Sequence, residues 1–597
     1  MPPKRKEFLK PNANTRAKPS GPQTENDFLE AADEFEQSAG KWRAGDIAKA
    51  TRFFNRAIDM YNAGLQKYPN SFDLAYNKAN LEYNMIEDPR VVSILGDKIS
   101  LLEETLSSHR TAIALNSDNT DILFNTAQVL TSLAEALLEK GTQETAKVPS
   151  RALLEEAVEI FTKCLASQQR EYEEMQVEIA KAHAAQRLSE VEKGLEAGQN
   201  ATTQVLQQDR METSSTISDE RGDWATIIEP VTPETILETC TAQLEALSTL
   251  LCLYDPSDRH SLKRKVQMGL ETAEGKIPAL ANLLQDSSTD LSEEPALGPT
   301  LSIAPSGVVE VPKTSPRDDA FLAAANFKVS VAEVAYRHGD SSAVEYGKQI
   351  EQIFASLDYT DNPDDLASVN VRCAFADALI NLASAVSENA QYTASSPNFI
   401  TDLESQWSAL SQAQAILTHI SSGVYSTRLS ASRLADIFLA RGDTDLFRFR
   451  ISLFYVAKSA WVKSKAVLVS NAGVFYRGAR SYAKRAGAVD VQRTADAKAT
   501  VAEILKAAAS GLEERKEHWK SETAEVVRVL EQMVEEGIVG REDAKGLTCR
   551  ARGMLAMFFE LAPQISEIVR SSPSGHHAAV QKVVSYPTEK PAKETHI

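Results

Sequence analysis

Cysteine is scarce in this chain of 597 residues. The five cysteines show no C-x-x-C spacing and no clustering with histidine. Zinc sites need cysteine or histidine pairs at short spacing, and small disulfide frameworks need a much denser set of cysteines. The sequence therefore supports neither a metal site nor a disulfide framework, and a reducing compartment is the simple inference.

Glycine and proline are also few, at 26 and 23 residues, whereas 43% of the chain is hydrophobic. Alanine, leucine, glutamate and glutamine are abundant, and these residues favour helices. We expect an all-α protein with little or no sheet. No apolar run approaches the ~20 residues that cross a bilayer. The N-terminus is charged, so we expect neither a secretory signal nor a membrane partner.

Motifs of known catalytic chemistry are missing. The chain has no glycine-rich phosphate loop, no G-x-S-x-G and no H-x-x-x-H, and its nine histidines are dispersed. Carboxylate pairs are common along the predicted helices, as solvated helix faces require, and without an apolar pocket they indicate no acid–base role. We expect a protein that is not an enzyme and that holds no cofactor.

The acidic excess is uneven along the chain. The formal net charge is −19, but residues 1–20 hold six basic residues and one acidic residue, a net +5 that leaves −24 for the rest. An acidic body repels the backbone of nucleic acid and favours basic protein partners. Moderate acidity also serves solubility alone, and both interpretations stay open.

The first 26 residues are rich in proline, lysine, asparagine and serine, with hardly any apolar side chain. They cannot bury enough surface to offset the entropy of ordering, so a disordered basic arm is expected. Lys4, Arg5 and Lys6 form a compact cluster of the kind that nuclear import receptors read, although such clusters also occur by chance. The import hypothesis predicts a protein of nucleus and cytoplasm.

One helical pattern is written twice. Asp73-Leu-Ala-Tyr-Asn-Lys-Ala79 and Asp121-Ile-Leu-Phe-Asn-Thr-Ala127 share residue types at the same offsets, 48 residues apart. Around them, Ala50-x3-Phe54-x2-Ala57-Ile58 returns as Ala157-x3-Phe161-x2-Cys164-Leu165, with these positions on one side of a helix. Two kinds of helix alternate, which predicts an α-solenoid, a fold that presents surfaces to partners.

These residues resemble the tetratricopeptide repeat. In that family a small residue in helix A precedes a Gly-Asp turn, and Ala, an aromatic residue and Ala follow in helix B. The residues on those positions are Ser38, Gly45-Asp46, Ala50, Phe54 and Ala57. Gly339-Asp340 and Gly442-Asp443 repeat the predicted turn. The resemblance covers about 27–490 and implies antiparallel helix pairs, although the recurrence of 48 residues exceeds the usual ~34.

Composition divides the chain into successive parts. We expect a first helix at 27–43 and a second helix that continues to about Tyr68. Further along, we expect a loop at 140–150, a long helix at 151–197 and a single helix at 262–284. A Ser-, Pro- and Asp-rich linker is expected at 286–317. The expected organisation is a disordered arm 1–26, an N-terminal helical array 27–285 with a flexible insertion 199–223, the linker 286–317, a C-terminal array 318–570 and a disordered tail 571–597.

Amides stand at matching places in two predicted A helices: Asn77 and Asn80 in one, Asn125 and Gln128 in the next. Asparagine is a modest helix former, so its position in mid-helix needs another reason, such as hydrogen bonds to a bound peptide backbone. The resemblance implies that A helices line a concave groove, which makes these amides candidate partner-binding residues. The alternative is that they cap or bridge neighbouring repeats.

Asp121 predicts the charge of the partner. Family members that bind acidic C-terminal tails clamp them with Lys and Arg on helix A, whereas here Asp121 and Asn125 occupy those positions. A carboxylate would repel an acidic tail and suit a basic one. We therefore expect a basic or extended partner segment.

Residues 448–489 form a basic segment that holds no acidic residue and interleaves its charges with aromatic rings. Segments of this kind hold RNA by phosphate contact and base stacking. The alternative is that the rings belong to the core and the cations neutralise acidic helices nearby. The basic residues are Arg448, Arg450, Lys458, Lys463, Lys465, Arg477, Arg480, Lys484 and Arg485.

Together these patterns predict a non-enzymatic scaffold, or chaperone-like adaptor, that binds another protein. The rival hypothesis is an RNA- or ribosome-associated factor that uses the basic segment 448–489. The two differ in the expected surface potential, since RNA needs a continuous positive groove.

Overall fold

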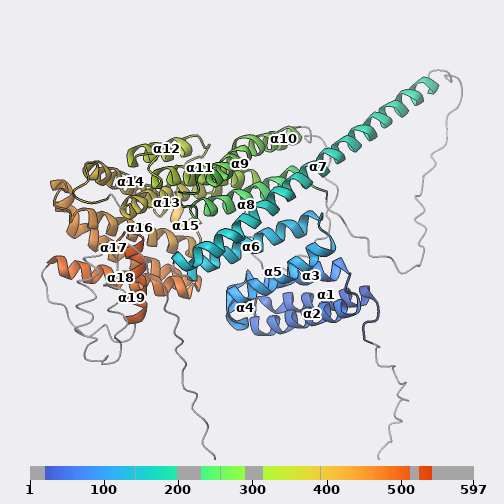
Figure 1. Cartoon of the computed structure of the whole chain (residues 1–597), viewed down its shortest axis with the longest axis horizontal. Helices are drawn as coiled ribbons and strands as arrows, with labels where there is room; N and C mark the ends of the chain where they lie inside the picture. Colours follow the sequence, from blue (N-terminus) through green and yellow to red (C-terminus); the bar gives the residue numbers. More distant parts are fainter. Residues whose placement is uncertain are drawn as a thin grey trace, which may run out of the picture.

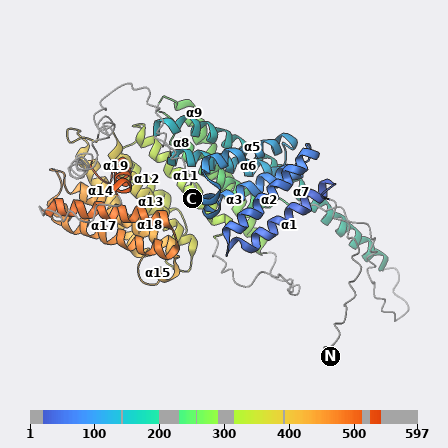
Figure 2. The same cartoon turned by 90° about the horizontal axis from the view of Figure 1, so that it is seen from below.

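The computed structural model describes residues 21–140, 143–197, 230–255, 257–289, 314–389, 392–510 and 523–540. Every regular element in these residues is a helix, so the prediction of an all-α fold is confirmed. The helices form an arc, with α1–α5 at one end, α16–α19 at the other and α6–α11 between (Figures 1 and 2).

The helices are mostly five to six turns long, with a few short connecting ones. In the first half their bounds are α1 (Glu25–Arg43), α2 (Ile47–Lys67), α3 (Phe72–Ile86), α4 (Pro89–Leu95), α5 (Lys98–Leu115), α6 (Thr120–Lys140), α7 (Gln143–Ala197), α8 (Pro233–Leu251), α9 (Arg259–Glu271), the π-helical turn η1 (Thr272–Lys276) and α10 (Ile277–Thr289).

The second half continues in the same style. Its elements are α11 (Pro316–Arg337), α12 (Ala343–Ala355), α13 (Leu366–Glu388), α14 (Phe399–Ile420), α15 (Tyr425–Arg428), α16 (Ala431–Ile451), α17 (Ser459–Ala486), α18 (Val489–Ser510) and α19 (Thr523–Glu535).

Neighbouring helices pack in pairs, and each pair packs on the next. The pairs include α1 with α2, α3 with α5, α6 with α7, α13 with α14 and α16 with α17. Contacts between α3 and α6, α6 and α8, and α8 and α11 join successive pairs through their first helices. This stacking of helix pairs is the α-solenoid that the repeat pattern predicts.

Local signals at the helix ends explain where several pairs turn. Thr24 accepts a hydrogen bond from the Asp27 amide, and Asp27 accepts one from the Thr24 amide, so this capping box begins α1. Asp46 caps α2 by accepting from the Lys49 amide at 2.9 Å. Gly339, with φ of +79°, turns the chain between α11 and α12, which favours glycine.

The recurrence of 48 residues has a structural cause. The short helix α4 lies between α3 and α5, with Pro89 in its first turn and Asp88 as its cap. Asp88 is buried and forms ion pairs with Arg43 of α1 at 3.0 Å and with Arg90 at 2.9 Å. The extra helix lengthens this repeat beyond the usual ~34 residues and ties it to the first helix pair.

Two expected boundaries are wrong. The expected loop at 140–150 is helical from Gln143, and Pro149 lies inside α7 rather than ending it. The expected single helix at 262–284 is broken by the π-helical turn η1, which contains Gly275 and is followed by Pro278. Both residues weaken regular α-helical hydrogen bonding at this point.

The predicted turn at Gly442-Asp443 is also wrong. Both residues lie inside α16, which continues to Ile451. A Cβ on Gly442 would lie 2.4 Å from the Tyr476 ring of α17, so the glycine permits close helix packing. The glycine here reflects tertiary contact, and the chain does not reverse.

Packing is continuous across the predicted linker 286–317. One hydrophobic core extends from α3 to α11 and includes Leu130, Leu247 and Phe327. Helix α11 packs directly on α8, although α9, η1, α10 and residues 290–313, which lie outside the described residues, come between them in sequence. The helices on the two sides of the linker therefore share a core.

Helix α13 differs from the expectation that no apolar run approaches the length that crosses a bilayer. Of the described helices it is the one long and apolar enough to cross a bilayer by length and composition. Within the protein, 56% of its most apolar stretch is buried, and it packs against α14, α11 and α16. Its composition is that of a core helix.

Several expectations fall outside the described residues. These are the basic cluster Lys4, Arg5 and Lys6, the insertion 199–223, most of the linker and the tail 571–597. Helix α7 carries the chain toward the insertion as a long arm that leaves the body of the protein (Figure 1).

Candidate protein-binding surfaces

Helices α3 and α6 lie side by side with their equivalent residues aligned. The hydroxyl groups of Tyr83 on α3 and Ser132 on α6 are 3.3 Å apart. Seven residues earlier on each helix, the Asn125 side chain of α6 faces the Tyr76 hydroxyl of α3. Both pairs differ by 49 positions in sequence, close to the recurrence of 48, so the repeat in sequence becomes a ladder in space. We call the surface that α3, α6, α8 and α11 share the A-helix face.

The four predicted amides lie on this face, and all are half-buried. Asn77 donates a hydrogen bond to the Asp73 carbonyl one turn earlier, at 2.9 Å. Asn80 accepts a weak bond from Asn84 at 3.5 Å. Asn125 faces Tyr76 of the preceding helix, which is the bridging arrangement. These contacts leave the carbonyl oxygen of Asn77 and the side chain of Gln128 without a described partner.

Asp121 is exposed at the start of α6. Burial raises the pKa of Tyr76, and the negative charge of Asp121 raises it further, so the two groups are electrostatic neighbours. The structure therefore places Asp121 beside Asn125 on the A-helix face.

Further carboxylates continue along this face, and sequence reasoning missed them. Glu245 on α8 is an electrostatic neighbour of both Glu135 on α6 and Asp319 on α11. Glu135 and Glu245 are exposed and form no ion pair with any described residue. No shared motif marks the three carboxylates, because they stand at different distances from the starts of α6, α8 and α11.

The pKa values of these carboxylates are shifted in one direction. Burial raises the pKa of Glu245, and the charges of Glu135 and Asp319 raise it further. Burial also raises the pKa of Glu135, although Lys98 opposes the shift. The A-helix face therefore gathers negative charge, with Glu135, Glu245 and Asp319 close enough to raise the pKa of Glu245.

Most aromatic rings of the basic segment 448–489 belong to the core. Phe449 and Tyr476 are buried, and Trp461 stacks on Trp407 of α14 with ring centroids 4.6 Å apart. Tyr455 is the exception, with 79% of its surface exposed. The rings therefore do not form a continuous platform for stacking bases.

Five of the nine cations in this segment have described partners. Arg477 pairs with Glu503 at 2.7 Å and Arg480 with Asp496 at 2.8 Å, both across to α18. Lys458 pairs with Glu404 of α14, and Arg448 with Asp445. Arg450 donates to the Ser387 hydroxyl and to the Gly537 carbonyl.

The other four form no ion pair with any described residue, and they are Lys463, Lys465, Lys484 and Arg485. RNA binding by this segment stays a prediction.

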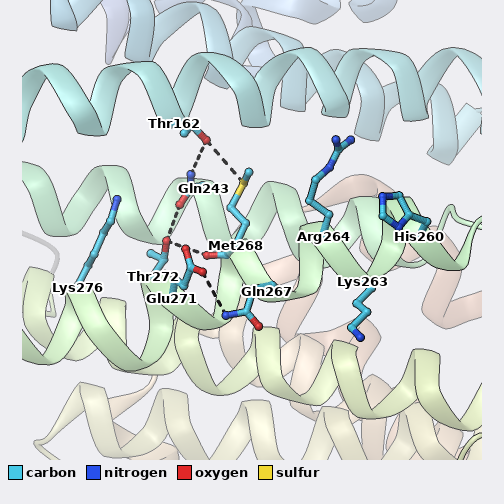
Figure 3. Close-up of a pocket in the computed structure, with 10 residues that line it drawn as sticks. All are labelled: Thr162, Gln243, His260, Lys263, Arg264, Gln267, Met268, Glu271, Thr272 and Lys276. Carbon is cyan, nitrogen blue, oxygen red and sulfur yellow. Dashed lines mark hydrogen bonds between the residues drawn. The ribbon is translucent and has the colours of Figure 1, made fainter.

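Sequence reasoning also missed a basic groove beside α9. The sequence Arg259-His-Ser-Leu-Lys-Arg-Lys265 holds five basic residues, four of them Lys or Arg and one His, in a chain whose remainder is strongly acidic. That charge run was a visible signal. What the run cannot show is the cavity that α7, α8 and η1 complete around it (Figure 3).

Comparison with known proteins adds little to this architecture. No protein family matches the chain. Over 142 residues it is 32% identical to the UPF0656 protein C926.02 of Schizosaccharomyces pombe (strain 972 / ATCC 24843), and the match covers 24% of this chain. The chain spans 31% of the length of that relative.

One solved structure, described as a circular tandem repeat protein with novel repeat topology and enhanced subunit contact surfaces, aligns over 88% of this chain. The identity is 13% and the TM-score is 0.27, which carries no argument. The described helices themselves establish the conclusion that this is a helical-repeat protein.

Proposed function

We propose that this protein is a scaffold of the tetratricopeptide type that binds a basic, extended segment of a partner protein on its A-helix face. The observation that carries the proposal is the closeness of three carboxylates from three helices of this face, Glu135 of α6, Glu245 of α8 and Asp319 of α11. Carboxylates that lie close together repel one another, and a Lys or Arg side chain between them removes that repulsion. The amides of α3 and α6 supply donors and acceptors for the backbone of the same segment.

The test is a binding titration of the purified full chain with a fluorescein-labelled peptide of alternating Lys and Gly. Glu135→Gln with Glu245→Gln removes two charges from the face and should weaken binding at least about tenfold. The matched control is Glu171→Gln with Glu174→Gln, which removes two exposed charges from the α7 arm. Equal weakening by both double variants would mean that net charge alone attracts the peptide.

The shifted pKa values give the same proposal a pH signature. Because the pKa values of Glu135 and Glu245 are raised, these carboxyls gain protons earlier than ordinary glutamates as pH falls. A protonated carboxyl attracts no lysine, so peptide affinity should decrease from about pH 7 toward about pH 5. In Glu135→Gln with Glu245→Gln this decrease should be much smaller.

The amides are tested by Asn77→Ala with Asn125→Ala. Each net hydrogen bond contributes about 1 kcal/mol, so the double variant should bind the peptide roughly tenfold more weakly with its helicity intact. Full affinity, or a loss of helicity, would assign the amides a structural role instead.

Nuclear and cytoplasmic distribution is part of this proposal and rests on Lys4, Arg5 and Lys6. Replacing all three by Ala should move a fluorescent fusion out of the nucleus. An unchanged distribution would show that the cluster is inert. The rival RNA-binding hypothesis has less support, since core packing and ion pairs account for most of the basic segment.

A further inference from the structure

A cavity of about 490 Å³ lies between α7 and α9, outside the A-helix face. Figure 3 shows α7 along one side, with α8, α9 and η1 forming the other. We call it the α9 groove. The residues that define it are Thr162 of α7, Gln243 of α8, and His260, Arg264, Met268 and Lys276 of α9 and η1.

The α9 groove is basic in an acidic protein. His260, Lys263, Arg264 and Lys276 line it, and none of the four forms an ion pair with a described residue. In Figure 3 the Arg264 and Lys276 side chains extend toward α7 from the two ends of the cavity. Three of the four lie in the first two turns of α9, where the helix dipole disfavours cations. Stability of the helix therefore does not explain them.

The floor of the groove is polar and fixed. Gln243, which is 1% exposed, donates a hydrogen bond to the Thr162 hydroxyl at 3.0 Å and accepts one from the Thr272 hydroxyl at 2.9 Å. This network joins α7, α8 and η1. The π-helical turn of η1 is a rare element that often marks functional sites, and here it carries Thr272 and Lys276.

An apolar cavity of about 440 Å³ adjoins the basic one, and Glu271 and Lys276 line both. Its apolar lining includes Leu165, Tyr172, Ile236 and Leu280. The surface along α7 therefore changes from cationic to apolar over a short distance. A peptide that carries acidic groups beside an apolar side chain matches both parts.

We propose that the α9 groove is a second docking site, which binds an acidic segment of a partner protein through carboxylate or phosphate groups. Arg264 and Lys276 contact the anionic groups, and the adjoining apolar cavity holds a neighbouring Leu-like side chain. Apart from His260, no ring lines the basic cavity, so it lacks the stacking surface that single-stranded RNA needs. The site goes beyond the proposed basic-peptide face, because it lies elsewhere and selects the opposite charge.

The test is a titration of the full chain with a fluorescein-labelled peptide of repeating Glu-Glu-Leu. Arg264→Glu with Lys276→Glu should weaken binding at least about tenfold, because two attractive charges become repulsive. The matched control is Lys484→Glu with Arg485→Glu, which changes the net charge equally at the end of α17. Circular dichroism checks that both variants keep their helices. Equal loss in the control, or no loss in either, overturns the proposal.

A variant of opposite sign guards against misfolding as an explanation. Glu271 is exposed, lines both cavities and is hydrogen-bonded to Gln267 at 3.1 Å. Glu271→Gln removes a repulsive charge and should strengthen binding of the acidic peptide about threefold. Unchanged or weaker binding would contradict an anionic ligand in this groove.

Two further probes identify the ligand chemistry. A second peptide carries phosphoserine in place of one Glu. If it binds more tightly than the Glu-Glu-Leu peptide, the site recognises phosphate, and if it binds more weakly, the site recognises carboxylate. Oligouridylate that binds through Arg264 and Lys276, while the acidic peptide does not, overturns the proposal in favour of RNA. The Lys-Gly peptide should bind the Arg264→Glu, Lys276→Glu variant normally, so this proposal and the proposed function can fail separately.

Discussion

The dipeptide Gly-Asp has two different roles in this molecule. At 45–46 it ends the α1 segment and begins α2, in an exposed connection. At 442–443 it lies in the middle of α16, with Gly442 against Tyr476 and Asp443 in an ion pair with Lys498 at 2.8 Å. The difference shows that the surroundings of a short motif determine whether it turns the chain or packs it.

The two aspartates differ most in what they contact. Asp46 accepts a hydrogen bond from the Lys49 amide and is exposed to water. Asp443 accepts from the Tyr476 hydroxyl at 2.8 Å and from Lys498, whose side chain is only 6% exposed. One aspartate caps a helix end, whereas the other compensates a buried cation.

The largest expected effect is that of Asp443→Ala. It removes the carboxylate that is hydrogen-bonded to the buried Lys498 ammonium, which should lower the free energy of unfolding by about 3–5 kcal/mol. Hydrogen exchange of α16–α18, followed by mass spectrometry, measures the loss where it occurs. Adding Lys498→Met should restore most of the protection, and failure to do so would show that the ion pair is not the cause.

Gly442→Ala should have the next largest effect. Its Cβ would lie 2.4 Å from the Tyr476 ring, so the helices must separate or the ring must move, at a cost of about 1–3 kcal/mol. Gly40→Ala is the matched control, because Gly40 is also helical and has nothing within 4 Å of the added Cβ. In thermal unfolding, Gly442→Ala should lower the midpoint temperature, whereas Gly40→Ala should leave it unchanged or raise it.

Asp46→Ala should lower stability by about 1 kcal/mol, since it removes the side-chain cap of α2. Asp46→Asn keeps an acceptor at the same place and should be close to neutral. Urea unfolding followed by circular dichroism compares the two. A large loss with Asp46→Ala would mean that this turn, like Asp443, carries a tertiary contact.

The smallest effect is expected for Gly45→Ala. Nothing lies within 4 Å of the added Cβ, and Gly45 is not among the glycines with positive φ. The change should stay within about 0.5 kcal/mol of the original stability. A loss as large as that of Gly442→Ala, measured by the same thermal unfolding, would remove the distinction between the two dipeptides.

The sequence predicted the helices of the A-helix face but not its charge. The pattern at Asp73 and Asp121 indicated that α3 and α6 are equivalent, and the structure places them side by side. Glu135 and Glu245 carry no shared motif, because α8 follows a long insertion and repeats the pattern poorly. Their proximity depends on how α8 packs on α6.

Asn77 and Asn125 show the limit of reasoning from equal offsets. They occupy equivalent positions, yet Asn77 bonds to its own helix and Asn125 faces the Tyr76 hydroxyl of the helix before. Tyr76 has Phe124 as its equivalent on α6, which has no hydroxyl. The neighbouring helix, which differs from repeat to repeat, decides the contacts.

By itself the sequence determined the local structure: helical periodicity, capping residues such as Thr24 and Asp46, and the stacking of helix pairs in an α-solenoid. Periodicity and caps depend on residues within a few positions of one another, and the stacking was indicated by a motif that recurs 48 residues later. Only the tertiary structure decided which charges have partners. Arg480 is neutralised by Asp496, whereas Arg264 and Lys276 are left with an open cavity. The physical reason is that ion pairs need contact within about 4 Å, and helices remote in sequence supply or withhold the counter-ion.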